Sequence, residues 1–297
     1  MVGLIVYPIK DIQMQQIQET VKNAMRDNGM TPPDAIITDG QLHRFKDESG
    51  KLNSYYTAHV DGRAAGMIGN WKTGLQVNWK SDGDYPKLTD QQRMDFRIEK
   101  HRQERLRKAE EKQRHDGAAH KAAHIWKQSK PVTQHPYLTK KRVLPHNAGL
   151  YNEALVIPVL NDGALVSLQF IDKDGTKRFL TGGKLKGSYS QLGHYNPDKP
   201  ILLCEGWATG ASLYEATGNP VYVAFSANNL KAVAGYVRSL YPMNDIIIMG
   251  DNDLSGVGQV AAKEAASSIG GKYLIPETIG HDWNDAINME VNLWVLN

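Results

Sequence analysis

The stretch that decides the fold runs from residue 201 to residue 226 and reads ILLCEGWATGASLYEATGNPVYVAFS. Two short apolar segments, rich in branched residues, enclose one helical segment, and the same alternation continues toward residue 296. Apolar runs of this kind suit strands that are buried on both faces. The pattern predicts an α/β domain with a parallel four-stranded sheet flanked by helices. The expected strands are 201–205, 221–225, 245–249 and 272–275, and the expected helices are 209–216, 229–240, 257–269 and 284–296.

The chain before residue 199 has a different pattern. Residues 11–30 have helical spacing, and 34–79 predict a small antiparallel sheet with glycine turns. A charged helical pattern covers 89–116, and a second helical stretch covers 118–128; a solvated connector is favoured there over a nucleic-acid-binding helix. Strand patterns return at 155–160, 165–171 and 178–181. We expect four parts: a small N-terminal β-rich α+β domain (1–88), a charged helical connector (89–130), a basic, β-rich mixed α+β subdomain (131–198) and the α/β domain (199–297).

Composition excludes several classes of protein. The mean hydropathy of −0.48 leaves no membrane-spanning stretch, and no basic region precedes the apolar residues 2–7, which argues against a secretory signal. We therefore expect a cytoplasmic protein without a membrane partner. The one cysteine, Cys204, excludes a disulfide scaffold and a four-cysteine zinc ribbon. Its position in an apolar strand indicates an inert packing residue.

The net charge of +3 conceals two regions of opposite sign. Residues 117–197 hold 11 Lys and Arg against 4 Asp and Glu, whereas residues 198–297 hold 5 against 11. Part of the basic excess lies in one glycine-rich stretch of ten residues, with Lys177, Arg178, Lys184 and Lys186. That composition suits a solvated hairpin and a phosphate-contacting loop about equally well.

Carboxylates follow the predicted strands at their carboxyl ends, where parallel sheets bind ligands. Glu205 follows the first strand, Asp251 and Asp253 follow the third, and Asp282 and Asp285 follow the fourth. Each motif alone is common in turns and helix caps. Together they would repel one another unless a divalent cation held them ionised. Oxygen ligands without thiols predict Mg²⁺ or Mn²⁺.

These motifs resemble the Toprim domain shared by bacterial-type primases, topoisomerases and some nucleases. The likeness lies in Glu205-Gly206-x-x-Thr209-Gly210, in Asp251-Asn252-Asp253 and in Asp282-Trp283-Asn284-Asp285. Residues 43–79 and 165–187 are similar to segments that flank Toprim in the primases of plasmids and phages. The resemblance thus covers most of the chain.

The resemblance implies a DNA primase that makes short RNA primers on single-stranded DNA, by metal-dependent nucleotidyl transfer, for replication of a phage, plasmid or other mobile element. It implies that Glu205 is a general base or metal-positioning residue and that Asp251 and Asp253 hold the metal, with Asp282 and Asp285 as secondary ligands. The implied partners are single-stranded DNA, ribonucleoside triphosphates and a separate helicase. Template or nucleotide would contact Lys177, Arg178, Lys184 and Lys186.

Two other functions fit the same residues. A Toprim nuclease would use the carboxylates to activate water against a phosphodiester. A non-catalytic replication accessory protein would bind single-stranded DNA without them. A topoisomerase is disfavoured because it needs a nucleophilic tyrosine on a separate domain.

Overall fold

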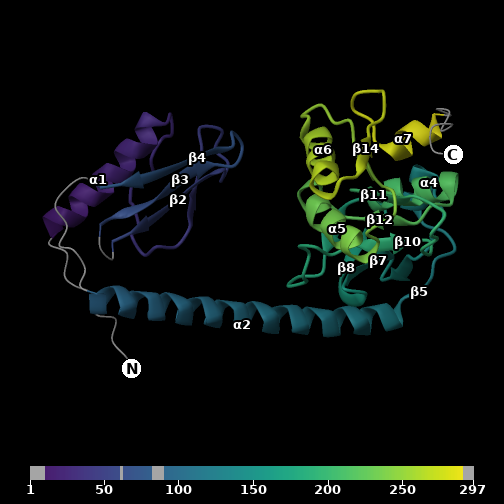
Figure 1. Cartoon of the computed structure of the whole chain (residues 1–297), viewed down its shortest axis with the longest axis horizontal. Coiled ribbons are helices and arrows are strands. Elements are labelled where there is room, and N and C mark those ends of the chain that lie inside the picture. The colour runs from purple at the N-terminus through teal and green to yellow at the C-terminus, as the bar shows by residue number, and fades with distance from the viewer. Residues whose placement is uncertain (1–10, 61–62, 82–89, 290–297) are drawn as a thin grey trace. The chain divides into compact units, whose positions relative to one another are not determined.

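The computed structural model describes residues 11–60, 63–81 and 90–289. The chain divides into two compact units, Met1–Gln103 and Glu104–Asn297 (Figure 1). The predictions for the apolar segment 2–7 and for the helix beyond residue 289 lie outside the described residues. Among the residues that are described, no helix is both long enough and apolar enough to cross a membrane.

The first unit is one helix packed on a small sheet. Helix α1 (Asp11–Asp27) buries Ile17, Val21 and Met25 in a core shared with the sheet. Each strand pairs antiparallel with the next in chain order, which confirms the small antiparallel sheet that the sequence predicts. The strands are β1 (His43–Phe45), β2 (Ser54–His59), β3 (Ala65–Asn70) and β4 (Leu75–Lys80).

Helix α2 (Asp90–Gln128) is continuous over 39 residues. The expectation of two helices separated near Gly117 is therefore wrong. A glycine weakens a helix by about 1 kcal/mol relative to alanine, which is too little to end one whose neighbours are good helix formers. Leu106 is exposed, as expected of a solvated helix, whereas Ala118 and Ala122 are buried.

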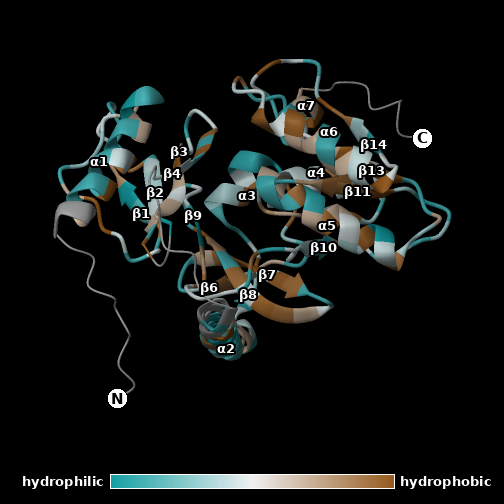
Figure 2. Cartoon of the chain, turned by 60° about the vertical axis from the view of Figure 1, so that its left-hand side comes forward, coloured by the Kyte–Doolittle hydropathy of each residue, from teal (hydrophilic) through white to brown (hydrophobic). Residues whose placement is uncertain are grey.

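An antiparallel sheet of five strands follows in the order β5-β6-β7-β8-β9. Its long hairpin, β7 (Ala154–Asn161) and β8 (Ala164–Ile171), agrees with the predicted strands. The flanking strands are β5 (Lys130–Pro131), β6 (Gly149–Tyr151) and β9 (Lys177–Phe179), and the short helix α3 (Pro136–Lys141) lies between β5 and β6 in the chain. Figure 2 shows α2 passing beneath this sheet.

A second five-stranded sheet has the order β10-β12-β11-β13-β14. Four strands are parallel and correspond to the predicted ones: β11 (Ile201–Cys204), β12 (Val221–Val223), β13 (Ile246–Met249) and β14 (Lys272–Leu274). The prediction of a purely parallel, four-stranded sheet is wrong at one edge. There β10 (Ser190–Leu192) pairs antiparallel with β12. Three residues, two of them polar, give no strand pattern in sequence.

Helices cover both faces of the second sheet, and the side chains of β11 alternate between them. Ile201 and Leu203 belong to the core with α5 (Ala227–Leu240) and α6 (Val257–Ile269). Leu202 and Cys204 belong to the core with α4 (Trp207–Thr217) and α7 (Trp283–Asn288).

The core that contains Leu202 and Cys204 also includes residues of the β5–β9 sheet, among them Leu155 and Ile157 of β7. Leu160 and Tyr189 exchange backbone hydrogen bonds of 2.7 and 2.9 Å, which join the end of β7 to the residue that precedes β10. Cys204 is fully buried in this shared core, and burial raises the pKa of its thiol well above the usual value. Cys204 is therefore a packing residue, as expected. The shared core fixes the basic and acidic parts of the second unit against each other.

Candidate functional site

A cavity of about 210 Å³ lies where the carboxyl ends of β11 and β13 face β8, β9 and α3. Two oppositely charged groups of side chains meet in it. The acidic sheet contributes three carboxylates, and the basic part contributes two lysines. The lining residues are Tyr137, Lys141, Gln169, Lys177, Glu205, Gly206, Trp207, Ala208, Thr209, Phe225, Asp251 and Asp282.

Glu205 follows β11 directly and points into the cavity region. Burial raises the pKa of its carboxyl, Lys177 opposes that shift, and the charge of Asp253 adds to it. The backbone N–H of Ala227, at the start of α5, donates a hydrogen bond to the Glu205 carboxylate. The Glu205 carboxylate is thus held at the end of the buried strand β11, where little water reaches it.

Asp251 is the most perturbed acid of the cavity. Burial, followed by the charges of Glu205 and Asp282, raises the pKa of its carboxyl to about 7. Its Oδ1 is buried and has no hydrogen-bond partner among the described residues. A buried carboxylate oxygen without a partner is costly unless something bound at the site satisfies it.

Asp253 has different surroundings, although it is two residues from Asp251. Its Oδ1 accepts hydrogen bonds from Ser255 N at 2.9 Å and Ser255 Oγ at 2.5 Å. Its Oδ2 accepts one from Gly258 N, at 2.7 Å. These bonds lower the pKa of Asp253, with Ser255 as the largest cause. Asp253 therefore closes the turn before α6, and it is not among the residues that line the cavity.

Asn252, between the two acids, joins two loops. Its Nδ2 donates to the carbonyl of Pro276 at 2.8 Å, and its Oδ1 accepts from Gln259 Nε2 at 2.7 Å. Its backbone N–H donates to the carbonyl of His281 at 3.0 Å. These contacts fix the loop that carries Asp251 against the loop that leads to Asp282.

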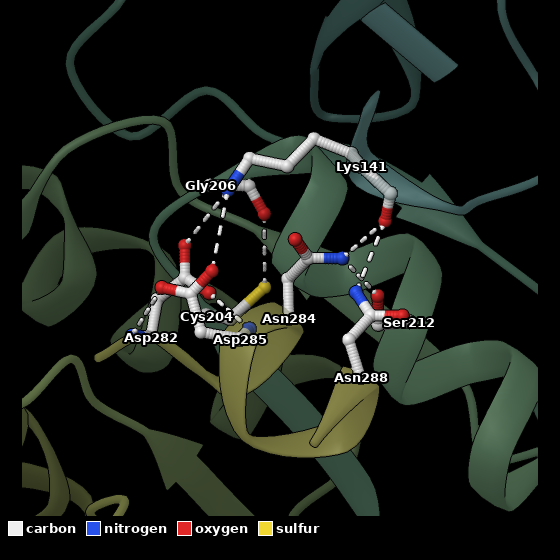
Figure 3. Close-up of polar contacts among 8 residues, drawn as sticks. All are labelled: Lys141, Cys204, Gly206, Ser212, Asp282, Asn284, Asp285 and Asn288. Carbon is white, nitrogen blue, oxygen red and sulfur yellow. Dashed lines mark hydrogen bonds and ion pairs between the residues drawn. The ribbon is translucent and has the colours of Figure 1, made fainter. Parts of the chain in front are cut away.

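Asp282 and Asp285 form the N-terminal capping box of α7. Asp282 Oδ1 accepts from Asp285 N at 2.9 Å, and Asp285 Oδ2 accepts from Asp282 N at 3.3 Å. Their other oxygens face Lys141 Nζ at 3.7 and 3.8 Å (Figure 3). Asp282 reaches the cavity, whereas Asp285 is not among its lining residues.

Helix α7 also holds the backbone of Lys141. The carbonyl of Lys141 accepts hydrogen bonds from Asn284 Nδ2 at 2.7 Å and Asn288 Nδ2 at 3.2 Å. Asn284 Nδ2 donates further to Ser212 Oγ of α4, at 2.7 Å. One helix thus fixes both ends of Lys141 (Figure 3). The sequence reasoning missed Lys141, whose signal was the basic run of residues 140–142 after a proline.

The four predicted basic residues do not all reach the cavity. Lys177 lines it, with its Nζ 5.9 Å from the centre of the Tyr137 ring, and its pKa is lowered by burial and then by Lys141. The adjacent Arg178 instead pairs with Asp172 and lies over the ring of Phe170. Two others lie outside the lining as well: Lys184 donates to Asn161 Oδ1 at 2.6 Å, and Lys186 is exposed.

The glycines of the Glu205 motif allow close packing. Gly206 precedes α4 as its N-cap, and its carbonyl accepts from Gly210 N at 2.9 Å. A Cβ on Gly210 would lie 2.6 Å from Val223 Cγ2 and 3.2 Å from Cys204 Sγ. Thr209 is buried at the edge of the cavity. The motif therefore seats α4 on the sheet and leaves Glu205 at the strand end.

The carboxylates of the cavity can supply some, but not all, of the ligands of a divalent cation. Among the described residues, no group of three or more His, Cys, Asp or Glu is already arranged around a common point. Of the acids that line the cavity, Glu205 and Asp251 have raised pKa values, and Asp251 has the unpartnered oxygen. Mg²⁺ commonly binds to one or two carboxylates and takes its other ligands from water and phosphate. The pair fits that mode.

Residues 200–292 match the family profile of the Toprim domain. Two DNA primases named TraC from Escherichia coli are 31% identical over 258 residues and 32% identical over 283 residues. These matches cover 81% and 87% of this chain but only 24% and 19% of the relatives, so the chain spans a quarter or less of their length.

Among solved structures, the primase fragment of the bacteriophage T7 primase-helicase is 22% identical, with a TM-score of 0.38 over 51% of this chain and 64% of that one. The family match lies on the sheet whose strand ends carry Glu205 and Asp251. The TraC matches extend over most of the rest of the chain. The chain therefore carries a Toprim domain at residues 200–292, within a region similar to one part of the DNA primases TraC.

Proposed function

We propose that this chain is the catalytic core of a DNA primase, which joins ribonucleotides on single-stranded DNA during replication of a plasmid, phage or other mobile element. The observation that carries the proposal is the cavity in which Glu205 and the unpartnered oxygen of Asp251 face Lys141 and Lys177. The Toprim match and the similarity to the TraC primases support it.

Glu205 and Asp251 would hold a divalent cation, Mg²⁺ or Mn²⁺. When bound, such a cation supplies positive charge to a triphosphate and keeps nearby carboxylates ionised. Asp253 and Asp285 accept hydrogen bonds from the starts of α6 and α7. To serve as ligands they would have to give up those bonds, so we assign them to holding the two loops.

The chain's own side chains would then perform the reaction. Lys141 and Lys177 line the same cavity as the acids and would neutralise charge on the phosphates of the nucleotide. The raised pKa of Glu205 makes its carboxylate a better acceptor for the proton of an attacking 3′-hydroxyl. Positioning and charge neutralisation supply most of the rate in transfers of this type.

The partners are single-stranded DNA, ribonucleoside triphosphates and a separate helicase. Arg178, Lys184 and Lys186 lie outside the cavity on the same basic segment and suit contacts with the template phosphates. Binding through such contacts weakens steeply as salt concentration rises.

Primer synthesis on single-stranded DNA with Mg²⁺ or Mn²⁺ tests the proposal. We expect labelled ribonucleotides to be joined into short products, and Asp251→Asn to abolish them. Asp245→Asn is the matched control, because Asp245 is an exposed acid paired with Lys272, outside the cavity. Undiminished synthesis by Asp251→Asn contradicts the proposal. Nicking of plasmid DNA without primer synthesis would identify a nuclease instead, and metal-independent DNA binding alone an accessory protein.

A further inference from the structure

Two neutral side chains in the cavity carry buried polar atoms without partners. Gln169 is 4% exposed and Tyr137 is 3% exposed, and both line the cavity. Within the described part of the chain, neither Gln169 Oε1 nor the Tyr137 hydroxyl makes a hydrogen bond. Folded proteins leave few such atoms unsatisfied. Because both side chains line the cavity, a molecule bound there can supply the missing hydrogen bonds.

Both side chains stand on regular elements. Gln169 lies within β8, opposite Ile157 of β7 and Phe179 of β9. Tyr137 lies in the first turn of α3, where its backbone N–H donates to His135 Nδ1 at 3.2 Å. A subsite built on strands and helices holds a ligand group more precisely than one built on loops.

Their chemistry differs from that of the other polar residues in the cavity. Glu205, Asp251 and Asp282 are acids and Lys141 and Lys177 are bases, which suit a cation and phosphates. An amide oxygen together with a phenol suits a hydroxyl, which donates one hydrogen bond and accepts another. Burial, followed by the charge of Asp282, raises the pKa of Tyr137 to about 12, so the phenol keeps its proton at neutral pH.

We propose that Gln169 and Tyr137 form a subsite for a sugar hydroxyl of the incoming nucleotide, the 2′- or the 3′-hydroxyl, and thereby reject nucleotides that lack it. The inference rests on the proposed function, because it takes the cavity to hold a nucleotide. A site that hydrogen-bonds a hydroxyl rejects the analogue lacking it, since the buried partners are then left unpaired. The neutral pair thus sets which sugar is accepted, while the charged groups set where the phosphates lie.

The test compares kcat/KM for incorporation of ATP, 2′-deoxy-ATP and 3′-deoxy-ATP by the full chain on single-stranded DNA. We expect wild type to prefer ATP at least 100-fold over one of the two analogues, which also identifies the hydroxyl. Tyr137→Phe and Gln169→Leu should each reduce that preference at least tenfold, mainly through loss of activity on ATP.

Ser167→Ala is the matched control. Ser167 Oγ is equally buried and unpartnered, two residues before Gln169, but Ser167 does not line the cavity. Its removal should leave the preference unchanged. Melting temperatures show whether each variant folds, and Tyr137→Phe removes a single atom if Gln169→Leu fails to fold.

An unchanged preference in an active Tyr137→Phe variant overturns the proposal, as does equal use of all three nucleotides by wild type. The two side chains would then hold only water. Absence of any primer synthesis by wild type would instead count against the proposed function. In that case, equilibrium binding of ATP and the two deoxy analogues in the presence of Mg²⁺ tests the subsite, and equal affinities overturn it.

Discussion

The end of β13 and the turn that begins α6 are adjacent regions, and each holds one carboxylate of the motif Asp251-Asn252-Asp253. In the first region, Asp251 is buried, has an oxygen without a partner and has a pKa raised to about 7. In the second, Asp253 accepts hydrogen bonds from Ser255 and Gly258, and its pKa is lowered. Two aspartates that are two positions apart thus differ: Asp251 keeps an oxygen free to bind a ligand, whereas both oxygens of Asp253 accept hydrogen bonds from the chain.

The difference follows from what each residue meets as the chain leaves the strand. Asp251 is still at the carboxyl end of β13, where it lines the cavity with the first turn of α4 and is largely removed from water. Asp253 has reached the start of a helix, where free backbone N–H groups attract a carboxylate. A Cβ on Gly258 would lie 2.7 Å from the carbonyl oxygen of Asp251 and 2.8 Å from Asp253 Oδ2, so only glycine allows this turn. Asp251 is the catalytic candidate because it has an oxygen without a hydrogen-bond partner, not because of its charge, which Asp253 shares.

The largest expected effect separates the two acids by activity. Asp251→Asn should lower the rate of primer synthesis by about 10³-fold, the scale of losing a group that stabilises transition-state charge. Asp253→Asn should lower it by no more than about tenfold, because the amide oxygen can still accept the hydrogen bonds of one carboxylate oxygen, although the amide NH2 cannot accept those of the other. Equal losses in the two variants would make Asp253 a ligand and would remove the distinction between the regions.

The next effect is on stability as a function of pH, in protein freed of divalent cations. A pKa raised from 3.8 to about 7 means that ionising Asp251 costs the folded state about 4 kcal/mol. The free energy of unfolding should therefore fall as pH rises from about 4 to about 7, and then stay level for this group. Urea titrations across that range check it.

Two additions sharpen the pH test. Mg²⁺ should restore stability at pH 7, since it binds the ionised form, and Asp251→Asn should flatten the profile. A profile that is the same in wild type and Asp251→Asn would show that the buried acid does not titrate in this range.

A smaller effect is expected at α7, which fixes Lys141. Asn284→Ala removes the 2.7 Å hydrogen bonds to the Lys141 carbonyl and to Ser212. We expect KM for the nucleotide to rise about tenfold, with a smaller change in kcat, because Lys141 loses its fixed position. In a Lys141→Met background the same substitution should leave KM unchanged, and Ser212→Ala is the control for lost packing. If Asn284→Ala raises KM equally with and without Lys141→Met, Asn284 does not act through Lys141 and contributes to stability alone.

The smallest effect is the loss of the hydrogen bonds that Asp253 accepts from the turn and from the start of α6. Asp253→Ala removes the bonds to Ser255 and Gly258 and should cost about 1 kcal/mol, or roughly 2–4 °C in melting temperature for a unit of this size. Differential scanning calorimetry measures it. A loss several times larger would mean that Asp253 supports more than the start of α6.

The sequence is enough to predict the parallel strands, because compact branched segments alternate with helical ones. It also places Glu205 and Asp251 together, because both follow parallel strands of one sheet. It does not predict β10, since its three residues gain their strand conformation from the edge of β12. Nor does it separate Asp251 from Asp253, because a helix cap and a metal motif contain the same residue types. Lys141, Gln169 and Tyr137 reach the cavity only through contacts between distant parts of the chain.

The hydrogen bond between Lys141 and Asn284 joins residues that are 143 positions apart in the chain. At a synthesis rate of roughly 5–20 residues per second, α7 leaves the ribosome roughly 7–30 s after α3. During that interval Glu205 and Asp251 appear, but the helix that seats Lys141 has not yet been made. The nascent chain would therefore acquire Glu205 and Asp251 before its positioned lysine, and competence would wait for the synthesis of α7.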